Sequence, residues 1–385
     1  MSIDPTIGRP LQSVLKPQRI RAALVRQVGG PFIVEDLSLS PPGRGEIMVR
    51  LHGTGICHTD LVCRDGFPVP LPIVLGHEGA GTVVALGDGV ESLQVGDPVV
   101  MSFGSCGQCP NCARHQPAYC HSMVPINFGG QRWPDGGTAL QQGDRPVHGH
   151  FFDQSSFATY AIGQARSAVK VDPDLPLHLL GPLACSMQTG AGAVMRSLRL
   201  QRDESFAVFG GGAVGLSAVM MARHLEASHI VVVEPVAARR ALALELGATA
   251  AIDPRSTGDV VTALREATGG GVYRALDTTG LPQVIEQAFQ ALAPNGLLGL
   301  LGVSAPDAQL PVRIMDLVLR GAGVKAILEG DSDPQTFIPQ LLALYRSGRF
   351  PFDRLVRTYP FEAINEAARA AASGEVIKPV LLFGA

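Results

Sequence analysis

The chain has 385 residues, of which 46% are hydrophobic and 17% charged, a composition typical of globular proteins that excludes an intrinsically disordered chain. The net charge of −3, without any block of like charges, makes nucleic acid and anionic membrane surfaces poor candidates as partners, and no apolar run reaches the roughly 18 residues that a membrane span needs. Residues 1–19 carry Pro5, Pro10 and Pro17 but no apolar stretch, so they predict an N-terminal extension rather than a signal peptide.

Between residues 20 and 100, short runs rich in Val, Ile and Leu alternate with Gly and Pro turns, as in 47–55, 79–87 and 95–102. This pattern predicts many short strands in a compact all-β barrel or sandwich. Residues 101–150 are rich in Cys, Gly, Pro, Gln and His and show neither the helical nor the strand period of apolar residues, so we expect an irregular lobe. Such a lobe buries little apolar surface, and a bound metal would supply the missing stability.

After about Cys185 the pattern changes to alternating strands and helices. Strands are expected over 205–210, 229–234, 247–253, 273–280 and 297–303, with helices between them over 211–226, 239–247, 259–269 and 281–296. This rhythm predicts a doubly wound parallel α/β sheet. From about residue 328 the rhythm ends, and two amphipathic helices (337–350 and 361–374) precede a closing strand (378–383) that could return to the first domain.

Seven cysteines in a chain without an export signal argue against a disulfide framework and predict a reducing, cytoplasmic location, where clustered cysteines more often bind metal. Four of them lie within fifteen residues: Cys106, Cys109, Cys112 and Cys120. Zinc takes four thiolates tetrahedrally, and such a site is structural because no position stays open for substrate. An iron–sulfur cluster uses the same set of ligands, and four unrelated thiols are a further alternative. The spacing predicts a metal site and favours zinc.

Three further segments, far apart in the sequence, carry residues that bind metals. They contribute Cys57 with His58, Thr59 and Asp60 beside it, the pair His77 and Glu78, and Cys185. Each alone has an ordinary explanation, since a single Cys is more often a small buried hydrophobe and a His–Glu pair is more often a surface or core pair. If the segments converge, two Cys and one His make a catalytic zinc site with one open position. Such a zinc polarises an alcohol oxygen and lowers its pKa.

Residues 206–215 read FAVFGGGAVG, which places a G-x-G-x-x-G turn between a strand and a helix. In that context Gly210 allows a tight turn, Gly212 lets the backbone approach a pyrophosphate, and Gly215 lets helix and strand pack closely. Glu234 ends the next strand, where a carboxylate accepts both ribose hydroxyls and repels a 2′-phosphate. Glu234 therefore favours NAD over NADP, although Arg239 and Arg240, which follow it, weaken that preference. A glycine-rich turn without a nucleotide is the alternative.

In kind and order these motifs resemble the zinc-containing medium-chain alcohol dehydrogenases, from about Ile20 to the C-terminus. The segment GHEGAG (76–81), the four-cysteine lobe and the glycine-rich turn carry the resemblance. Within the family, the chain is most similar to the benzyl- or aryl-alcohol dehydrogenase branch through the segments CHTDLVCRDGFPVPLPIVLGHEGAG, HFFDQSSFATYA, EGDSDPQTFIPQLLALYRSGRFPFD and IKPVLLF. The resemblance implies an α/β protein with a β-rich, GroES-like catalytic domain and a Rossmann domain, and an active site in the cleft between them.

The resemblance also implies two zinc ions in each chain. The structural zinc would bind the four clustered cysteines, and the catalytic zinc would bind Cys57, His77 and Cys185. Thr59 would hydrogen-bond the alcohol on the zinc and start its proton toward solvent. Asp60 would orient His77, and Glu78 would lie behind the zinc as a supporting group or transient ligand.

One departure from the family concerns the path of that proton. In the liver-type enzymes a histidine a few residues after the threonine completes the relay, and Val62 stands at the matching position here. We therefore expect the proton to leave by water or another group. Cys63 has no assigned role.

For NAD and the substrate the resemblance implies two further sets of residues. Besides the glycine-rich turn and Glu234, the cofactor set has His58 and Lys378 near the pyrophosphate, Arg239 at the adenosine ribose, and Val303. The substrate pocket is expected from Ser102, Phe103, Phe151, Phe152, Leu301 and Val303. Aromatic and aliphatic walls suit a flat, apolar alcohol, although each Phe taken alone is equally well explained as core.

The expected function is NAD-dependent, reversible oxidation of primary alcohols, aromatic or allylic, to aldehydes by hydride transfer from an alkoxide on zinc. A glutathione-linked formaldehyde dehydrogenase and a non-catalytic protein that binds zinc and nucleotide are the alternatives. The expected domains are an extension (1–19), a catalytic domain (20–185 with 329–385) and an NAD-binding domain (186–328). Family resemblance implies a homodimer or a homotetramer.

Overall fold

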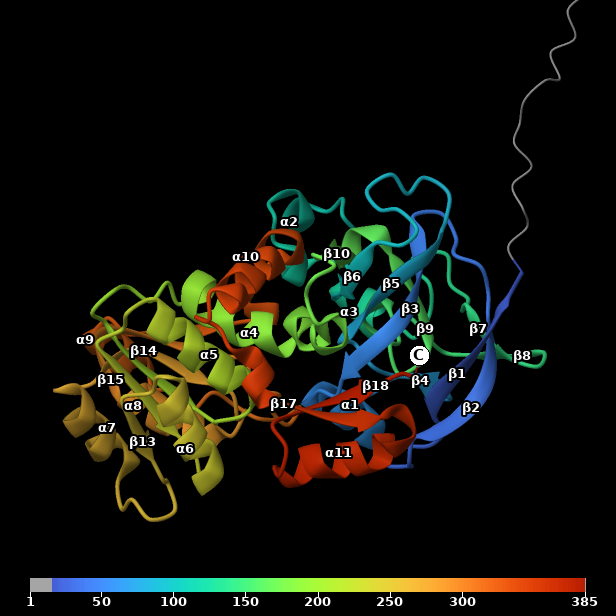
Figure 1. Cartoon of the computed structure of the whole chain (residues 1–385). Helices are drawn as coiled ribbons and strands as arrows, with labels where there is room; N and C mark the ends of the chain where they lie inside the picture. Colours follow the sequence, from blue (N-terminus) through green and yellow to red (C-terminus); the bar gives the residue numbers. More distant parts are fainter. Residues whose placement is uncertain (1–15, 385) are drawn as a thin grey trace, which may run out of the picture.

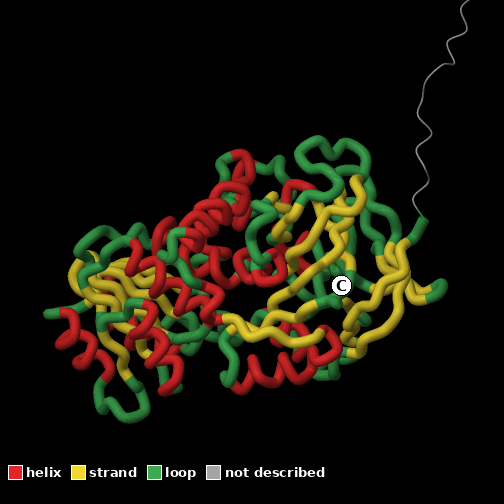
Figure 2. Tube along the Cα trace, viewed as in Figure 1, coloured by secondary structure: helices red, strands yellow, loops and turns green. Residues whose placement is uncertain are grey.

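The computed structural model describes residues 16–384, and the strands within that range form three sheets (Figure 1). Two of the sheets lie in one half of the molecule and the third lies in the other half, with helices gathered around it (Figure 2). Of the proposed extension, residues 1–15 lie outside the described residues. The first strand, β1 (Gln18–Val25), begins two residues before the proposed boundary.

The first half of the chain is β-rich, as its composition predicts. One sheet has the order β4-β1-β2-β7-β8 and a second has the order β10-β6-β5-β3-β18-β17, with β9 also paired to β3. The bounds of these further strands are β2 Ile33–Leu39, β3 Glu46–Gly55, β4 Ile73–Val74, β5 Gly79–Leu86, β6 Pro98–Met101, β7 Leu140–Gln142, β8 Arg145–Val147, β9 Tyr160–Gln164, β10 Ala168–Lys170, β17 Val356–Pro360 and β18 Lys378–Leu382.

The C-terminal tail returns to this half of the molecule. Strand β18 pairs antiparallel with β3, with Val380 opposite Gly55, so the last strand (red) lies beside one of the first (blue) in Figure 1. Helix α11 (Ile364–Ser373) packs its buried face into the same hydrophobic core as β1 and β2. The tail therefore closes the β-rich half instead of extending the other.

The expected irregular lobe contains more regular structure than its composition indicates. Residues 101–150 include two short helices, α2 (Pro110–Ala113) and α3 (Met123–Phe128), and the hairpin of β7 and β8. Helix α2 is a single turn without a buried residue. Elements this short show no readable hydrophobic period, which is why the sequence does not reveal them.

The third sheet has the order β13-β12-β11-β14-β15-β16, and every neighbouring pair is parallel. Its strands are β11 Ser205–Phe209, β12 His229–Val233, β13 Ala250–Ile252, β14 Val272–Asp277, β15 Leu292–Leu300 and β16 Gly323–Ala326. This is the strand order of dinucleotide-binding α/β sheets. The predicted helix over 281–296 is too long at its C-terminal end, because α8 (Pro282–Gln290) stops and β15 begins already at Leu292.

Helices cover both faces of this sheet. The core on one face includes α5 (Ala213–His224) and α6 (Ala237–Leu246), and the core on the other includes α7 (Val260–Thr268), α8 and α9 (Ile314–Arg320). The first core continues through α4 (Ser186–Gly192) and α10 (Pro334–Arg346) to the β-rich half. Within residues 16–384, no helix has both the length and the apolar character that a membrane span requires.

Candidate metal and cofactor site

The turn from β3 into helix α1 (His58–Asp65) presents the first metal-type side chain. The helix begins directly after Cys57, whose backbone N–H donates to Asp60 Oδ2 over 2.9 Å. The same carboxylate accepts the Gly76 N–H through Oδ1 over 3.1 Å. Asp60 therefore ties the start of α1 to the segment that carries His77.

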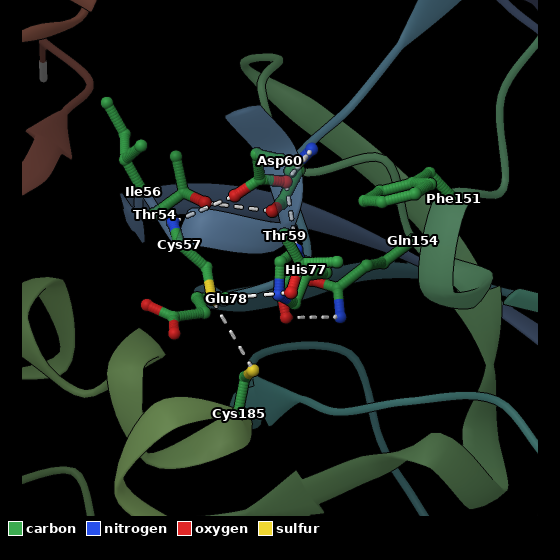
Figure 3. A network of polar contacts seen from close by, with 12 residues as sticks. Thr54, Ile56, Cys57, Thr59, Asp60, His77, Glu78, Phe151, Gln154 and Cys185 are labelled. Atoms are coloured by element: carbon green, nitrogen blue, oxygen red, sulfur yellow. Dashed lines mark hydrogen bonds and ion pairs between the residues drawn. The ribbon is translucent and has the colours of Figure 1, made fainter. Parts of the chain in front are cut away.

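Three segments far apart in the sequence meet at this turn. Ligand atoms of Cys57, His77, Glu78 and Cys185 all lie within 4.8 Å of one another, and the two sulfur atoms are 3.9 Å apart (Figure 3). Tetrahedral zinc with Zn–S bonds of about 2.3 Å sets two sulfur atoms about 3.8 Å apart. The hydrogen bond from Cys185 lowers the pKa of the Cys57 thiol well below its usual range, which favours the thiolate that a metal needs.

His77 has the orientation of a metal ligand. Its Nδ1 lies 2.9 Å from Asp60 Oδ1, and both side chains are fully buried. Its Nε2 is buried without a hydrogen-bond partner among the described residues, an arrangement that is costly unless a ligand completes it. A carboxylate on the far nitrogen is the usual support of a zinc-bound histidine. The donor set and its geometry fit zinc.

Glu78 is held by a buried lysine and a serine hydroxyl. Both carboxylate oxygens lie 2.9 Å from Lys378 Nζ, and Oε1 accepts the Ser186 hydroxyl over 2.9 Å. Lys378 also donates to the Ile56 carbonyl over 3.1 Å and is 2% exposed. The sequence predicts Lys378 near a pyrophosphate, whereas the structure gives its ammonium group this buried partner.

The four clustered cysteines also converge. Their sulfur atoms lie within 4.8 Å of one another, with 3.6 Å between Cys109 and Cys112 and 3.9 Å between Cys106 and Cys112. Hydrogen bonds from the backbone amides of His121 and Cys112 lower the pKa of Cys109 to about 6. Four thiols at these distances have the geometry of a closed tetrahedral zinc site.

An aromatic wall borders the first group of ligands. The Phe152 ring stacks on the His77 imidazole at 4.4 Å, and Phe151 meets it edge-on at 5.6 Å. Phe128 of α3 contacts both rings, at 5.1 Å from Phe152 and 5.9 Å from Phe151. Phe103 is buried in the same hydrophobic cluster, so one side of the candidate metal site is apolar.

The remaining residues of the expected site differ in burial and in the atoms that they contact. Ser102 is buried and donates to the Ala184 carbonyl next to Cys185 over 2.9 Å, and Thr59 Oγ1 lies 3.9 Å from Cys57 Sγ. Leu301 is partly buried against the core, whereas Val303 is 53% exposed.

The glycine-rich turn has the expected backbone. Gly210 has φ +102°, a conformation that disfavours a side chain. A Cβ on Gly215 would lie 1.9 Å from the Gly210 carbonyl oxygen, whereas one on Gly212 would meet open space. Glu234 accepts the Gly211 N–H over 2.6 Å, which places its carboxylate beside this open space.

Two other residues of the expected cofactor set, His58 and Arg239, differ in exposure. His58 is exposed and lines a surface pocket of about 430 Å³ together with Val62 and Phe67. Arg239 donates to the Gly374 carbonyl over 3.1 Å, and its Nε is buried without a partner among the described residues.

Gln154 is a supporting residue that sequence reasoning misses. Its amide nitrogen donates to the His77 carbonyl over 3.0 Å (Figure 3). The same nitrogen donates to the Met101 carbonyl, and the side-chain oxygen accepts the Gly79 N–H, both over 3.0 Å. A single buried Gln has no spacing signal, because its partners are backbone atoms of distant segments of the chain.

Comparisons with known proteins agree with this geometry. Residues 43–173 match the alcohol dehydrogenase GroES-like domain, and residues 213–346 match the zinc-binding dehydrogenase family. The chain is 55% identical to a geraniol dehydrogenase of Castellaniella defragrans over 94% of this chain and 97% of the relative. It is 31% identical to the class-P alcohol dehydrogenase of Arabidopsis thaliana over 95% of this chain and 98% of the relative.

Solved structures show the same fold. An alcohol dehydrogenase zinc-binding domain protein from Burkholderia ambifaria is 50% identical with a TM-score of 0.94, over 96% of this chain and all of that one. Benzyl alcohol dehydrogenase from Acinetobacter calcoaceticus is 43% identical with a TM-score of 0.92, over 95% of this chain and all of that one. The chain belongs to the zinc-containing medium-chain alcohol dehydrogenases.

Proposed function

We propose that this zinc-dependent alcohol dehydrogenase oxidises primary alcohols with an aromatic or allylic group, reversibly and with NAD as the hydride acceptor. The observation that carries the proposal is the stack of Phe152 on His77, because it sets a flat apolar surface against a candidate metal ligand. Similarity to a geraniol dehydrogenase and to a benzyl alcohol dehydrogenase supports the same substrate class.

In this proposal Cys57, His77 and Cys185 hold a catalytic zinc, and the four-cysteine lobe holds a structural one. When bound, the catalytic zinc supplies Lewis-acid polarisation of the alcohol oxygen. The Thr59 hydroxyl takes the alcohol proton. The glycine-rich turn of Gly210, Gly212 and Gly215 would hold NAD⁺. The cofactor would supply the hydride acceptor, so that the alcohol would become an aldehyde and NAD⁺ would become NADH.

The proton leaves through solvent on the His58 side of helix α1. Val62 cannot carry a proton, but it lines the same open surface pocket as His58. Water in this pocket would give Thr59, the neighbour of His58 in sequence, a route to bulk solvent. A His58→Gln variant tests whether the imidazole takes part: unchanged proton release would leave water as the carrier.

The adenosine end of the cofactor is assigned to Glu234 and Arg239. The Glu234 carboxylate beside the glycine-rich turn favours the two ribose hydroxyls of NAD over a 2′-phosphate. Arg239, with a buried and unpartnered Nε, would contact the ribose. The proposed domain division follows the sheets, since the parallel sheet ends at Ala326 and β18 pairs with β3.

We assign the edge of the parallel sheet to contact with a second copy of the chain. Strand β16 is the last in its sheet among the described residues, and helix α9 beside it exposes Ile314, Val318 and Leu319 by 66–77%. An unpaired edge with apolar cover is typical of subunit contacts. Light scattering coupled to gel filtration would distinguish dimer, tetramer and monomer.

Initial rates of NADH formation on the zinc-replete protein test the proposed reaction. The panel has benzyl alcohol, cinnamyl alcohol, geraniol, ethanol and hydroxymethylglutathione, each with NAD and with NADP. The proposal expects fast turnover of the first three with NAD. Turnover of hydroxymethylglutathione alone would indicate a glutathione-linked formaldehyde dehydrogenase. Silence across the panel, with zinc confirmed bound, would contradict the proposed substrate class.

A further inference from the structure

Glu329 is a buried carboxyl group that has no part in the reaction described above. It is 7% exposed and follows strand β16, which ends at Ala326. Its Oε2 accepts the Thr189 hydroxyl over 3.2 Å. Thr189 lies one helical turn beyond Cys185, to whose carbonyl its own N–H donates over 2.9 Å. A short chain of contacts therefore links Glu329 to a candidate zinc ligand.

The backbone around Glu329 is held in an unfavourable conformation. Glu329, Gly330 and Asp331 have φ values of +49°, +66° and +52°, and two of these three residues carry side chains. Such a segment persists only when its surroundings enforce it, and such strain is common at functional sites. Here Asp331 is fixed by the Tyr119 hydroxyl and the Lys325 ammonium group.

The other side of the segment is packed directly on helix α4. Gly330 lies so close to the helix that a Cβ on Gly192 would be 2.4 Å from its carbonyl oxygen. The hydroxyl of Ser332 donates to the Gln188 side chain over 2.7 Å. The position of the Glu329 carboxylate is therefore set by rigid neighbours on both sides.

Glu329 follows the carboxyl end of a strand in the parallel sheet, and Thr189 connects it to the metal site. Dinucleotides bind along that edge of such a sheet. Glu329 also interacts electrostatically with residues of the metal site. Burial raises the pKa of Glu329 to about 7, the charge of His77 lowers this pKa, and the charges of Cys57 and Glu78 raise it. A nicotinamide ring that accepted hydride from an alcohol at the metal site would therefore come near Glu329.

We propose that the Glu329 carboxylate is a further cofactor-binding group, which stabilises the cationic nicotinamide ring of NAD⁺ relative to the neutral ring of NADH. This inference rests on the proposed NAD-dependent function. In the oxidation of alcohol, the ring gains a hydride and loses its positive charge, while Glu329 neither gains nor loses a proton. The attraction is therefore present for the substrate form of the cofactor and absent for the product form, which favours NADH release.

Glu329→Gln tests the inference because it removes the charge and keeps the shape. The dissociation constants of NADH and NAD⁺ are measured on zinc-replete protein at pH 9, where a carboxyl group with a pKa of about 7 is ionised. NADH is followed by its fluorescence, and NAD⁺ by its competition with NADH. Glu226→Gln is the matched control, since Glu226 is an exposed acid paired with Arg202 and lies before the amino end of β12.

We expect Glu329→Gln to raise the NAD⁺ dissociation constant about tenfold and to leave that of NADH within about twofold, while Glu226→Gln changes neither. Equal weakening of both forms would overturn the inference, because it would indicate a packing or amide-binding role. Unchanged affinities for both would overturn it as well. Failure of the wild-type protein to bind NAD⁺ would instead count against the proposed function.

Discussion

Lys378 and Glu78 form an ion pair in the interior of the protein, with Nζ 2.9 Å from both carboxylate oxygens and side-chain exposures of 2% and 0%. Burial by itself lowers the pKa of Lys378, but the Glu78 charge raises it above its ordinary value. The pair joins the last strand, β18, to the segment that carries His77. It therefore links closure of the C-terminal tail to the geometry of the metal site.

Removing the lysine charge leaves a buried carboxylate without its main partner. We expect Lys378→Met to lower the free energy of unfolding by about 3–5 kcal/mol, as is usual when one member of a buried pair is lost. Urea denaturation at constant zinc concentration measures the loss. The double variant Lys378→Met/Glu78→Gln should recover much of it, because no uncompensated charge then remains.

An exposed ion pair provides the control for this experiment. Arg19 and Asp36 are 2.8 Å apart with side-chain exposures of 81% and 56%, and such pairs contribute roughly 0–1 kcal/mol. Arg19→Met should therefore change stability little. If Lys378→Met were equally mild, the interior pair would not have the structural role inferred here.

Asp60 is expected to set the affinity of the catalytic zinc without touching the ion. It contacts His77 Nδ1 and also accepts the Cys57 N–H, so Asp60→Asn should loosen both ligands. The expected loss is about 10- to 100-fold in zinc affinity, measured by competition with a chromogenic chelator. Asp65→Asn, at the exposed end of the same helix and paired with Arg64, should leave affinity unchanged. Equal affinities for the two variants would contradict the orienting role.

The sequence predicts the parts of this protein in which each element carries its own signal. The strand–helix alternation after Cys185 needs no knowledge of distant contacts, and the predicted strands lie where the structure has β11 to β15. The cysteine lobe is visible because its four ligands are neighbours in the chain. Pairing of β3 with β5 brings Cys57 to His77, and Cys185 joins them from the start of α4. Only the family resemblance brings the three residues together before the fold is known.

The contacts of single buried polar groups cannot be predicted from the sequence. Gln154 contacts backbone atoms of distant segments, and the position of Glu329 depends on a strained turn packed on α4. Neither residue type nor spacing marks such positions. Lys378 shows the same limit, since the resemblance predicts that it lies near a pyrophosphate but does not predict its ion pair with Glu78.

The four-cysteine lobe should lose its metal independently of the catalytic site. Cys112→Ser removes one of four thiolates, so we expect bound zinc to fall from about two ions per chain to about one. Elemental analysis after dialysis measures this, with loss of one zinc but retention of the second as the decisive pattern. Cys63→Ser is the control: burial raises the pKa of the Cys63 thiol well above its usual range, and it belongs to neither ligand group. Loss of both ions in Cys112→Ser would show that the two sites are coupled.

His150 should make the stability of the protein depend on pH in the mildly acidic range. Burial lowers the pKa of His150 from 6.5 to about 4, and its Nε2 has no partner among the described residues. Between these two values the unfolded chain binds a proton that the folded chain does not, so the free energy of unfolding falls as the pH is lowered from 6.5 toward 4. For this single group the loss between pH 7 and pH 5 is about 2 kcal/mol.

His150→Asn isolates that contribution. Asn tolerates the left-handed backbone that His150 adopts, with φ +57°, and it does not titrate in this range. Urea denaturation at pH 7 and at pH 5 gives the pH-dependent loss for each protein. Because every other titrating group is common to both, the loss in wild type should exceed that in the variant by about 2 kcal/mol. Equal losses would mean that His150 gains a proton in the folded state at pH 5, with Glu46 as the nearby charge that favours it.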